Sequence, residues 1–228
     1  MSVSKNSNWD TLLTTMLVVC ALVTTGLVLY RQLFVGSMGP VSPVFPRAVF
    51  ISDWRSQLAK GVTIGSLNAR VKLIEFSDFD CPYCAGLHAS LKPIMERYPG
   101  EISLSYIYFP IPIHRFAIYA ARVAECANDQ GHFSAMHDLL LEKQNLFGIK
   151  PWSEFAAEAG VPDIQSFESC IQRNDPMPRI VEGRKIGEQL DIKGTPTLLV
   201  NGWKLSHPPS SEELEQMVKR ILSGKSPV

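Results

Sequence analysis

The longest uncharged run in the chain lies near its N-terminus. Residues 11–30 contain no charged side chain, and Arg31 follows directly after them. A helix needs about 20 apolar residues to cross a bilayer, whereas the apolar part of a secretory signal is roughly 7–15 residues long. Because the run also has no polar face, we expect residues 1–35 to form an uncleaved membrane anchor that contains Cys20 as a small apolar residue.

The segment after the apolar run changes in composition. Residues 36–46 are rich in glycine, proline and serine, and residues 53–60 predict a short helix. We therefore interpret residues 36–60 as a linker with that helix at its end. Too few basic residues flank the apolar run for charge to set its orientation in a membrane.

The next part of the chain predicts a strand, a helix and a second strand. Residues 71–76 are almost all apolar, and residues 102–109 alternate and are rich in aromatic side chains, so both predict strands. Between them, apolar residues at helical spacing predict a helix over 82–98, which Pro93 should kink. The order is typical of an α/β fold.

The remainder predicts a helical block followed by a hairpin and a last helix. Helical patterns separated by turns run from about 113 to 190. Asn201-Gly202 predicts a hairpin turn between two short strands, and a capping box of Ser210 and Glu213 predicts a helix over 212–222. We expect one α/β domain over residues 61–224, interrupted by a helical insert at about 111–175.

Composition and charge limit the classes of partner. Apolar residues make up 46% of the 228 residues, enough for a sizeable core, and 22 basic residues balance 22 acidic ones. Without a basic patch or a net positive charge, nucleic acid is not an expected partner.

The candidate chemistry lies in the run Cys81-Pro82-Tyr83-Cys84, between the first strand and its helix. Pro82 suits the first position of a helix, and the helix N-terminus favours a thiolate at Cys81, whose pKa falls to roughly 3.5–7.5 in such settings. Cys84 lies nearly one turn further on, within disulfide reach. We predict that Cys81 exchanges disulfides with a substrate and that Cys84 resolves the mixed disulfide.

A metal site is the alternative interpretation of the two cysteines. Structural zinc needs four ligands, usually from a second cysteine or histidine pair at short spacing. His88 follows Cys84 by four residues, but one histidine does not complete such a set, and the other histidines show no pairing with a cysteine. We therefore expect no metal and no cofactor, and redox chemistry instead.

Two further positions are expected to serve the cysteine pair. Glu75 lies within the apolar strand before Cys81, so burial should raise its pKa and let it exchange a proton with Cys84; a carboxylate that reaches solvent at the strand end is the alternative. Thr195-Pro196 precedes the strand at 197–200, where a proline at the first residue is sterically allowed.

Two motifs together resemble the DsbA-like proteins of the thioredoxin superfamily. The run from Glu75 to Cys84 is similar to their active-site segment, and Gly194-Thr195-Pro196-Thr197 is similar to their cis-proline loop. The resemblance extends in outline over residues 60–224 and implies a thioredoxin fold with an inserted helical domain. It also implies that Glu75 is a buried acid, that Pro196 is cis and catalytic, and that Pro82, Tyr83 and Thr195 contact the substrate.

The resemblance departs from the family at one position. Strongly oxidising members carry Pro-His between their cysteines, whereas this chain has Pro82-Tyr83. Tyr83 offers no ring N–H to a thiolate, so the direction of net electron flow stays open.

Cys126 and Cys170 lie in two predicted helices of the insert. They are either free core cysteines or a structural disulfide, which some DsbA-like proteins carry in this region. We favour the disulfide, which an exported compartment would permit.

The leading functional hypothesis is a membrane-anchored dithiol oxidase for exported proteins. Its catalytic domain would lie on the extracytoplasmic side, its clients would be exported proteins with cysteines, and a DsbB-like or vitamin K epoxide reductase-like membrane partner would re-oxidise it. The alternatives are a disulfide reductase or isomerase fed by a membrane reductant, and an anchored thioredoxin-like binding module without catalysis.

Overall fold

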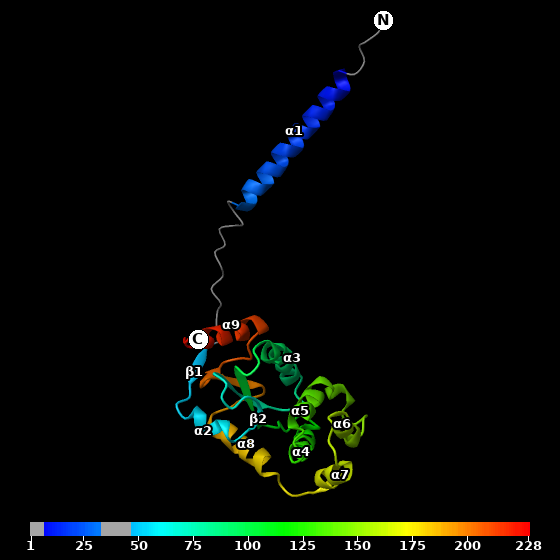
Figure 1. The fold of residues 1–228 in the computed structure, drawn as a ribbon, viewed down its shortest axis with the longest axis vertical. Helices are drawn as coiled ribbons and strands as arrows, with labels where there is room; N and C mark the ends of the chain where they lie inside the picture. Colours follow the sequence, from blue (N-terminus) through cyan, green and yellow to red (C-terminus); the bar gives the residue numbers. More distant parts are fainter. Residues whose placement is uncertain (1–6, 33–46) are drawn as a thin grey trace. The chain divides into compact units, whose positions relative to one another are not determined.

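The computed structural model describes residues 7–32 and 47–228, in two units divided after Val44 (Figure 1). In the first unit, helix α1 (Ser7–Tyr30) contains a span over Thr11–Tyr30 that is long and apolar enough to cross a membrane by length and composition. Most of the expected linker, residues 33–46, lies outside the described residues. The second unit holds every other element.

A mixed six-stranded sheet forms the centre of the second unit, in the order β1-β6-β5-β3-β4-β2. Strands β3 and β4 run parallel in the middle, and the other neighbouring pairs are antiparallel. The bounds of the strands are β1 (Ala48–Phe50), β2 (Val62–Gly65), β3 (Val71–Ser77), β4 (Ile102–Tyr108), β5 (Thr197–Val200) and β6 (Trp203–Leu205). Both central strands are buried almost throughout, as expected for strands with helices on both faces, and most of their residues are apolar.

Helices cover both faces of this sheet. Helices α3 (Pro82–Arg97) and α9 (Ser211–Leu222) pack on one face through apolar residues such as Leu91 and Met217. Helices α2 (Trp54–Leu58) and α8 (Pro178–Gln189) cover the other face, where Trp54 and Ile186 meet the side chain of Phe76 in one core cluster.

The helical insert follows β4. It comprises α4 (Ala117–Asn128), α5 (Phe133–Glu142), the 3₁₀ turn η2 (Gln144–Leu146), α6 (Trp152–Glu158) and α7 (Ile164–Gln172). Its core is continuous with the residues around the cysteine pair, because Phe79 stacks on Tyr106 at a centroid distance of 4.8 Å within the same apolar cluster as Phe155 and Phe167. The insert therefore forms one wall of the candidate site.

The expected α/β fold with a helical insert is confirmed, and the differences are local. Asn201 and Gly202 have φ angles of 45° and 89°, as the hairpin turn requires, and the Ser210–Glu213 capping box is present. Residues 48–50, assigned from sequence to the linker, form β1 and pair with β6 instead. Strands β1 and β2 are short and half-exposed, so their sequences carry little strand signal.

Candidate active site

The cysteine pair lies where β3 gives way to α3. Cys81 is the N-cap residue of α3 and has an extended backbone, while Pro82 occupies the first turn, where no N–H is needed. The backbone N–H groups of Cys84 and Ala85 both donate to the Cys81 carbonyl, at 3.1 and 3.2 Å. This local geometry places both sulfurs at the N-terminal end of the helix.

The thiols of Cys81 and Cys84 are both free and buried, and they differ strongly in acidity. The thiol of Cys84 donates a hydrogen bond to Cys81 and is the largest cause that lowers the pKa of Cys81 to about 5. Burial opposes this shift, while the Thr195 side chain and the backbone N–H groups of Cys84 and Tyr83 add to it. Cys81 is thus a thiolate at neutral pH, without a histidine in the inner dipeptide.

Cys84 has the opposite tendency. Burial is the main cause that raises the pKa of Cys84 far above its ordinary value, and the charges of Glu75 and Cys81 add to it. Cys84 therefore keeps its proton until a base removes it. The pair consists of one ready nucleophile and one thiol whose ionisation must be assisted.

Glu75 is a buried carboxyl on β3, the strand that leads into the cysteine pair. It is 1% exposed, and burial raises the pKa of its carboxyl to about 7, an effect that Ser77 partly opposes. Its Oε1 atom has no hydrogen-bond partner among the described residues. The sequence prediction of a buried carboxylate agrees with this placement, and a group that titrates near neutrality is suited to move a proton.

Three polar side chains hold the loop before Cys81, and no pattern in the sequence marks them for this role. The buried carboxylate of Asp78 accepts from the backbone N–H groups of Asp80 and Ile111, at 2.9 and 2.8 Å. Asp80 accepts from the backbone of Phe116. The Gln144 amide donates to the carbonyls of Phe79 and Cys81 at 2.7 and 2.9 Å, which ties the loop to the insert.

His114 joins this network from the loop after β4. Its Nδ1 lies 2.8 Å from Oδ2 of Asp78. Burial disfavours the charged imidazole, but the Asp78 hydrogen bond and the charges of Asp78, Cys81 and Asp80 outweigh it, so the pKa of His114 is raised. The site thus gains, from a distant part of the chain, an imidazole whose protonated form is favoured.

The predicted substrate-facing residues lie around Cys81. The Thr195–Pro196 peptide bond is cis, and Sγ of Cys81 lies 3.4 Å from the carbonyl oxygen of Thr195. Tyr83 projects into solvent and is 76% exposed at the start of α3. These contacts bring Pro196, Thr195 and the Cys81-to-Cys84 run together, as expected from the two motifs.

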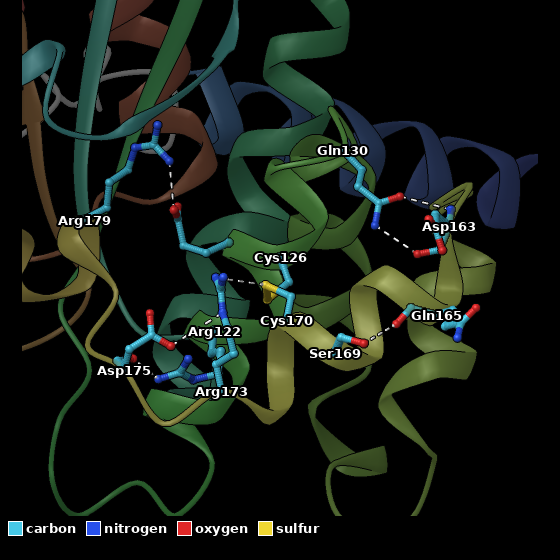
Figure 2. The surroundings of a disulfide bond; sticks show 11 residues. Arg122, Cys126, Gln130, Asp163, Gln165, Ser169, Cys170, Arg173, Asp175 and Arg179 are labelled. Carbon is cyan, nitrogen blue, oxygen red and sulfur yellow. Dashed lines mark hydrogen bonds and ion pairs between the residues drawn. A yellow bond between two sulfur atoms is a disulfide. The ribbon is translucent and has the colours of Figure 1, made fainter.

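Cys126 of α4 and Cys170 of α7 form a disulfide with a Cα–Cα distance of 5.9 Å (Figure 2). Next to it, the Gln130 side chain and the Asp163 backbone exchange two hydrogen bonds of 3.0 Å each. The disulfide lies within the insert and not beside the active-site pair, so the two cysteine pairs occupy different sites.

Comparison with known proteins agrees with this geometry. A family model described as Thioredoxin matches residues 57–220. The chain belongs to the thioredoxin family. Within that family its fold is of the DsbA type, and an apolar helix precedes that fold in the sequence.

Solved structures share the fold of this thioredoxin-family protein at low sequence identity. Oxidised BdbD from Bacillus subtilis has a TM-score of 0.65 and 17% identity, with 79% of this chain and 100% of that chain covered. The thiol–disulfide exchange protein α-DsbA2 from Wolbachia pipientis has a TM-score of 0.64 and 20% identity, with 74% and 92% covered. The catalytic domain of Proteus mirabilis ScsC has a TM-score of 0.61 and 20% identity, with 75% and 96% covered.

The curated relatives are longer proteins. Na⁺/H⁺ antiporter NhaA 3 from Salinispora tropica is 30% identical over 157 residues, which are 68% of this chain and 24% of the antiporter. NhaA 1 from Salinispora arenicola is 29% identical over 163 residues, which are 70% of this chain and 24% of the antiporter. The thioredoxin-family chain therefore spans about a quarter of the length of these relatives.

Proposed function

We propose that this protein is a dithiol oxidase that donates the Cys81–Cys84 disulfide to exported proteins. The observation that carries the proposal is the unequal acidity of the pair, with the pKa of Cys81 lowered to about 5 and that of Cys84 raised. Stabilising the thiolate stabilises the reduced form, which makes the disulfide a stronger oxidant. The Cys84 thiol and backbone N–H groups supply this stabilisation in place of the histidine that Tyr83 replaces.

The exchange proceeds in two displacements. A client thiolate attacks the Cys81 sulfur, which forms a mixed disulfide and releases Cys84 as a thiolate that takes a proton from Glu75. A second client thiolate then attacks the client sulfur of the mixed disulfide, which forms the client disulfide and releases the Cys81 thiolate. Two electrons pass from the client to the protein, and Glu75 takes the proton back during re-oxidation.

The surface around Cys81 suits unfolded clients. Tyr83 is 76% exposed, and Ile113, on the loop that carries His114, is 84% exposed. Exposed apolar side chains beside a nucleophile give an unfolded peptide apolar contacts without a demand for one sequence. Pro82 and the Thr195 backbone would border the same peptide.

Location and partners belong to the same proposal. The apolar span Thr11–Tyr30 would anchor the chain in the membrane with the catalytic domain on the extracytoplasmic side, where disulfides persist. Re-oxidation would come from a membrane protein of the DsbB-like or vitamin K epoxide reductase-like class, which removes the two electrons.

The reduction potential of the pair tests the direction of exchange. The full chain with Cys20→Ser, in detergent, is equilibrated with glutathione buffers, and the fraction of reduced Cys81–Cys84 is measured by alkylation and mass. We expect a potential nearer to about −120 mV than to about −270 mV. A potential at the lower value would overturn the oxidase proposal and favour a reductase.

Trapping in cells tests the client class. With Cys84→Ser, the Cys81 thiolate can still attack a client disulfide, which is the reverse of the second displacement and releases one client thiolate. No Cys84 thiol remains to displace the client from Cys81, so mixed disulfides with exported, cysteine-containing proteins should accumulate. The matched control carries both Cys81→Ser and Cys84→Ser. Adducts that form equally in the control, or that contain only cytoplasmic proteins, would contradict the proposal.

A further inference from the structure

A second cluster of reactive side chains lies away from the cysteine pair, between α3 and α5. These helices pack against each other (Figure 1). His88 comes from α3, and His137 and Asp138 come from α5; we call these three residues the two-histidine cluster. One possible ligand atom from each lies within 4.8 Å of the others.

Both imidazoles have a buried nitrogen without a partner. The side chains of His88 and His137 are 7% and 3% exposed. The Nε2 atoms of both rings have no hydrogen-bond partner among the described residues. Leaving a buried polar atom unpaired costs stability. The unpaired Nε2 of His88 lies 3.8 Å from a carboxylate oxygen of Asp138 and 3.6 Å from one of Glu142, which indicates a place for a ligand.

The distances in the cluster suit a small four-coordinate ion. Oδ1 of Asp138 forms a hydrogen bond of 3.1 Å with Nδ1 of His137 and lies 3.8 Å from Nε2 of His88; an ion would take the place of the proton in that hydrogen bond. The same His88 nitrogen lies 3.6 Å from Oε1 of Glu142. Zinc bonds of about 2.0–2.1 Å in a tetrahedron place neighbouring ligand atoms about 3.3 Å apart, so small side-chain adjustments would bring these atoms to an ion.

A lysine beside the cluster would remain compatible with an ion. Lys92 Nζ lies 2.9 Å from Oδ2 of Asp138 and 2.7 Å from Oε1 of Glu142. Lys92 therefore engages Oδ2 of Asp138 and not Oδ1, the oxygen that is bonded to His137. Lys92 and an ion would compete for the same oxygen only at Glu142. At Asp138, Lys92 would bond to a carboxylate that also binds the ion, and such second-shell hydrogen bonds are common at metal sites.

An adjoining cavity provides access. It has a volume of about 230 Å³ and is lined by the two-histidine cluster, by Lys92 and by apolar residues that include Leu91 and Leu104. A water molecule occupies about 30 Å³ of liquid volume, so the cavity can admit a hydrated ion and accept the waters that it sheds.

We propose that His88, His137 and Asp138 bind a Zn²⁺ ion, with Glu142 as the fourth ligand. Two imidazoles with carboxylate oxygens form a ligand set that suits zinc among the divalent ions. The bound ion links α3, which carries Cys84 one turn before His88, to α5 of the insert. It therefore joins the sheet-covering helix to the helical insert and stabilises the folded domain against unfolding.

Zinc titration of the oxidised full chain tests the site. The active-site disulfide removes Cys81 and Cys84 as ligands, and a Cys20→Ser background removes the remaining free thiol. Calorimetry of Zn²⁺ binding in detergent should give one saturable site, and the thermal unfolding midpoint should rise with Zn²⁺. His88→Gln and Asp138→Asn should each weaken binding at least 10-fold, while His207→Gln, at an exposed histidine, should leave it unchanged.

Cobalt substitution provides a test that needs no variant of the cluster. Co²⁺ bound by the same oxidised protein should give the intense visible bands of tetrahedral nitrogen and oxygen coordination, without a thiolate charge-transfer band. Absence of saturable Zn²⁺ binding, equal affinity in the cluster variants and the His207→Gln control, or an octahedral Co²⁺ spectrum would each overturn the proposal. The cluster would then be an ion-pair network around Lys92 only.

Discussion

The hydrogen bond from the Cys84 thiol can be removed without removing the nucleophile. In Cys84→Ala the Cys81 thiolate loses the thiol that donates to it, whereas in Cys84→Ser a hydroxyl donor of similar size remains. The Cys84 thiol is the largest cause that lowers the pKa of Cys81 to about 5. We therefore expect the alanine variant to titrate at a higher pH than the serine variant.

The size of this shift follows from the strength of a charge-assisted hydrogen bond. Such bonds contribute about 1.5–3 kcal/mol, and one pKa unit corresponds to about 1.4 kcal/mol. The pKa of Cys81 should therefore rise by about 1–2 units in Cys84→Ala and stay near its present value in Cys84→Ser. At pH 5 the thiolate fraction of the alanine variant, and with it the alkylation rate, should fall about 5- to 50-fold.

The assay is the pH dependence of iodoacetamide alkylation, with the ultraviolet absorbance of the thiolate as a second readout. Cys20 is an exposed free thiol, so both variants are made in a Cys20→Ser background, which leaves Cys81 as the reacting group. Equal midpoints in the alanine and serine variants would refute the reasoning. In that case the backbone N–H groups at the start of α3 would carry the shift.

Three further outcomes follow from the structure. The folded pKa of Cys81 is lowered to about 5 from 9.0, so its stabilisation of the reduced protein is fully present above pH 9 and is lost as the pH falls through 5. In urea unfolding, the difference in unfolding free energy between the protein and a Cys81→Ser control should therefore grow by about 1 kcal/mol per pH unit between pH 6 and 8. Glu75→Gln removes the group whose pKa burial raises to about 7, so stopped-flow disulfide exchange should slow at least 10-fold at pH 7 and lose its inflection near that pH, and an unchanged profile would exclude Glu75 as the proton carrier. Replacing Cys126 and Cys170 together by serine opens a disulfide with a sequence separation of 44 and should lower the unfolding free energy by about 4 kcal/mol in chemical denaturation, whereas no loss would show that the bond does not restrain the unfolded chain.

Local sequence patterns predicted the elements that depend on neighbours along the chain. The capping box of Ser210 and Glu213 and the turn at Asn201-Gly202 appear where expected, because their hydrogen bonds and φ angles are set within a few residues. Strands β1 and β2 were not predicted. Their stability comes from pairing with β6 and β4, which are remote in the sequence.

The active site likewise contains residues that local sequence positions and residues that only tertiary contacts bring to it. Cys81, Cys84 and Pro82 are positioned by the strand-to-helix junction that their own residues specify, so the sequence predicted the redox pair and the raised pKa of Glu75 in its apolar strand. The contact of Gln144 with the loop before Cys81 could not be predicted from the sequence. Its two hydrogen bonds to the loop exist only because the insert folds back onto the end of β3.

The sequence by itself determined that this chain carries a dithiol pair at a helix N-terminus, because periodicity, capping and proline geometry act over short distances. Tertiary structure alone decided what surrounds that pair and what else the chain holds. In sequence, His88 is a single histidine after Cys84, but packing of α3 on α5 places it beside His137 and Asp138. Contacts between helices depend on which apolar faces meet, and no local pattern specifies that choice.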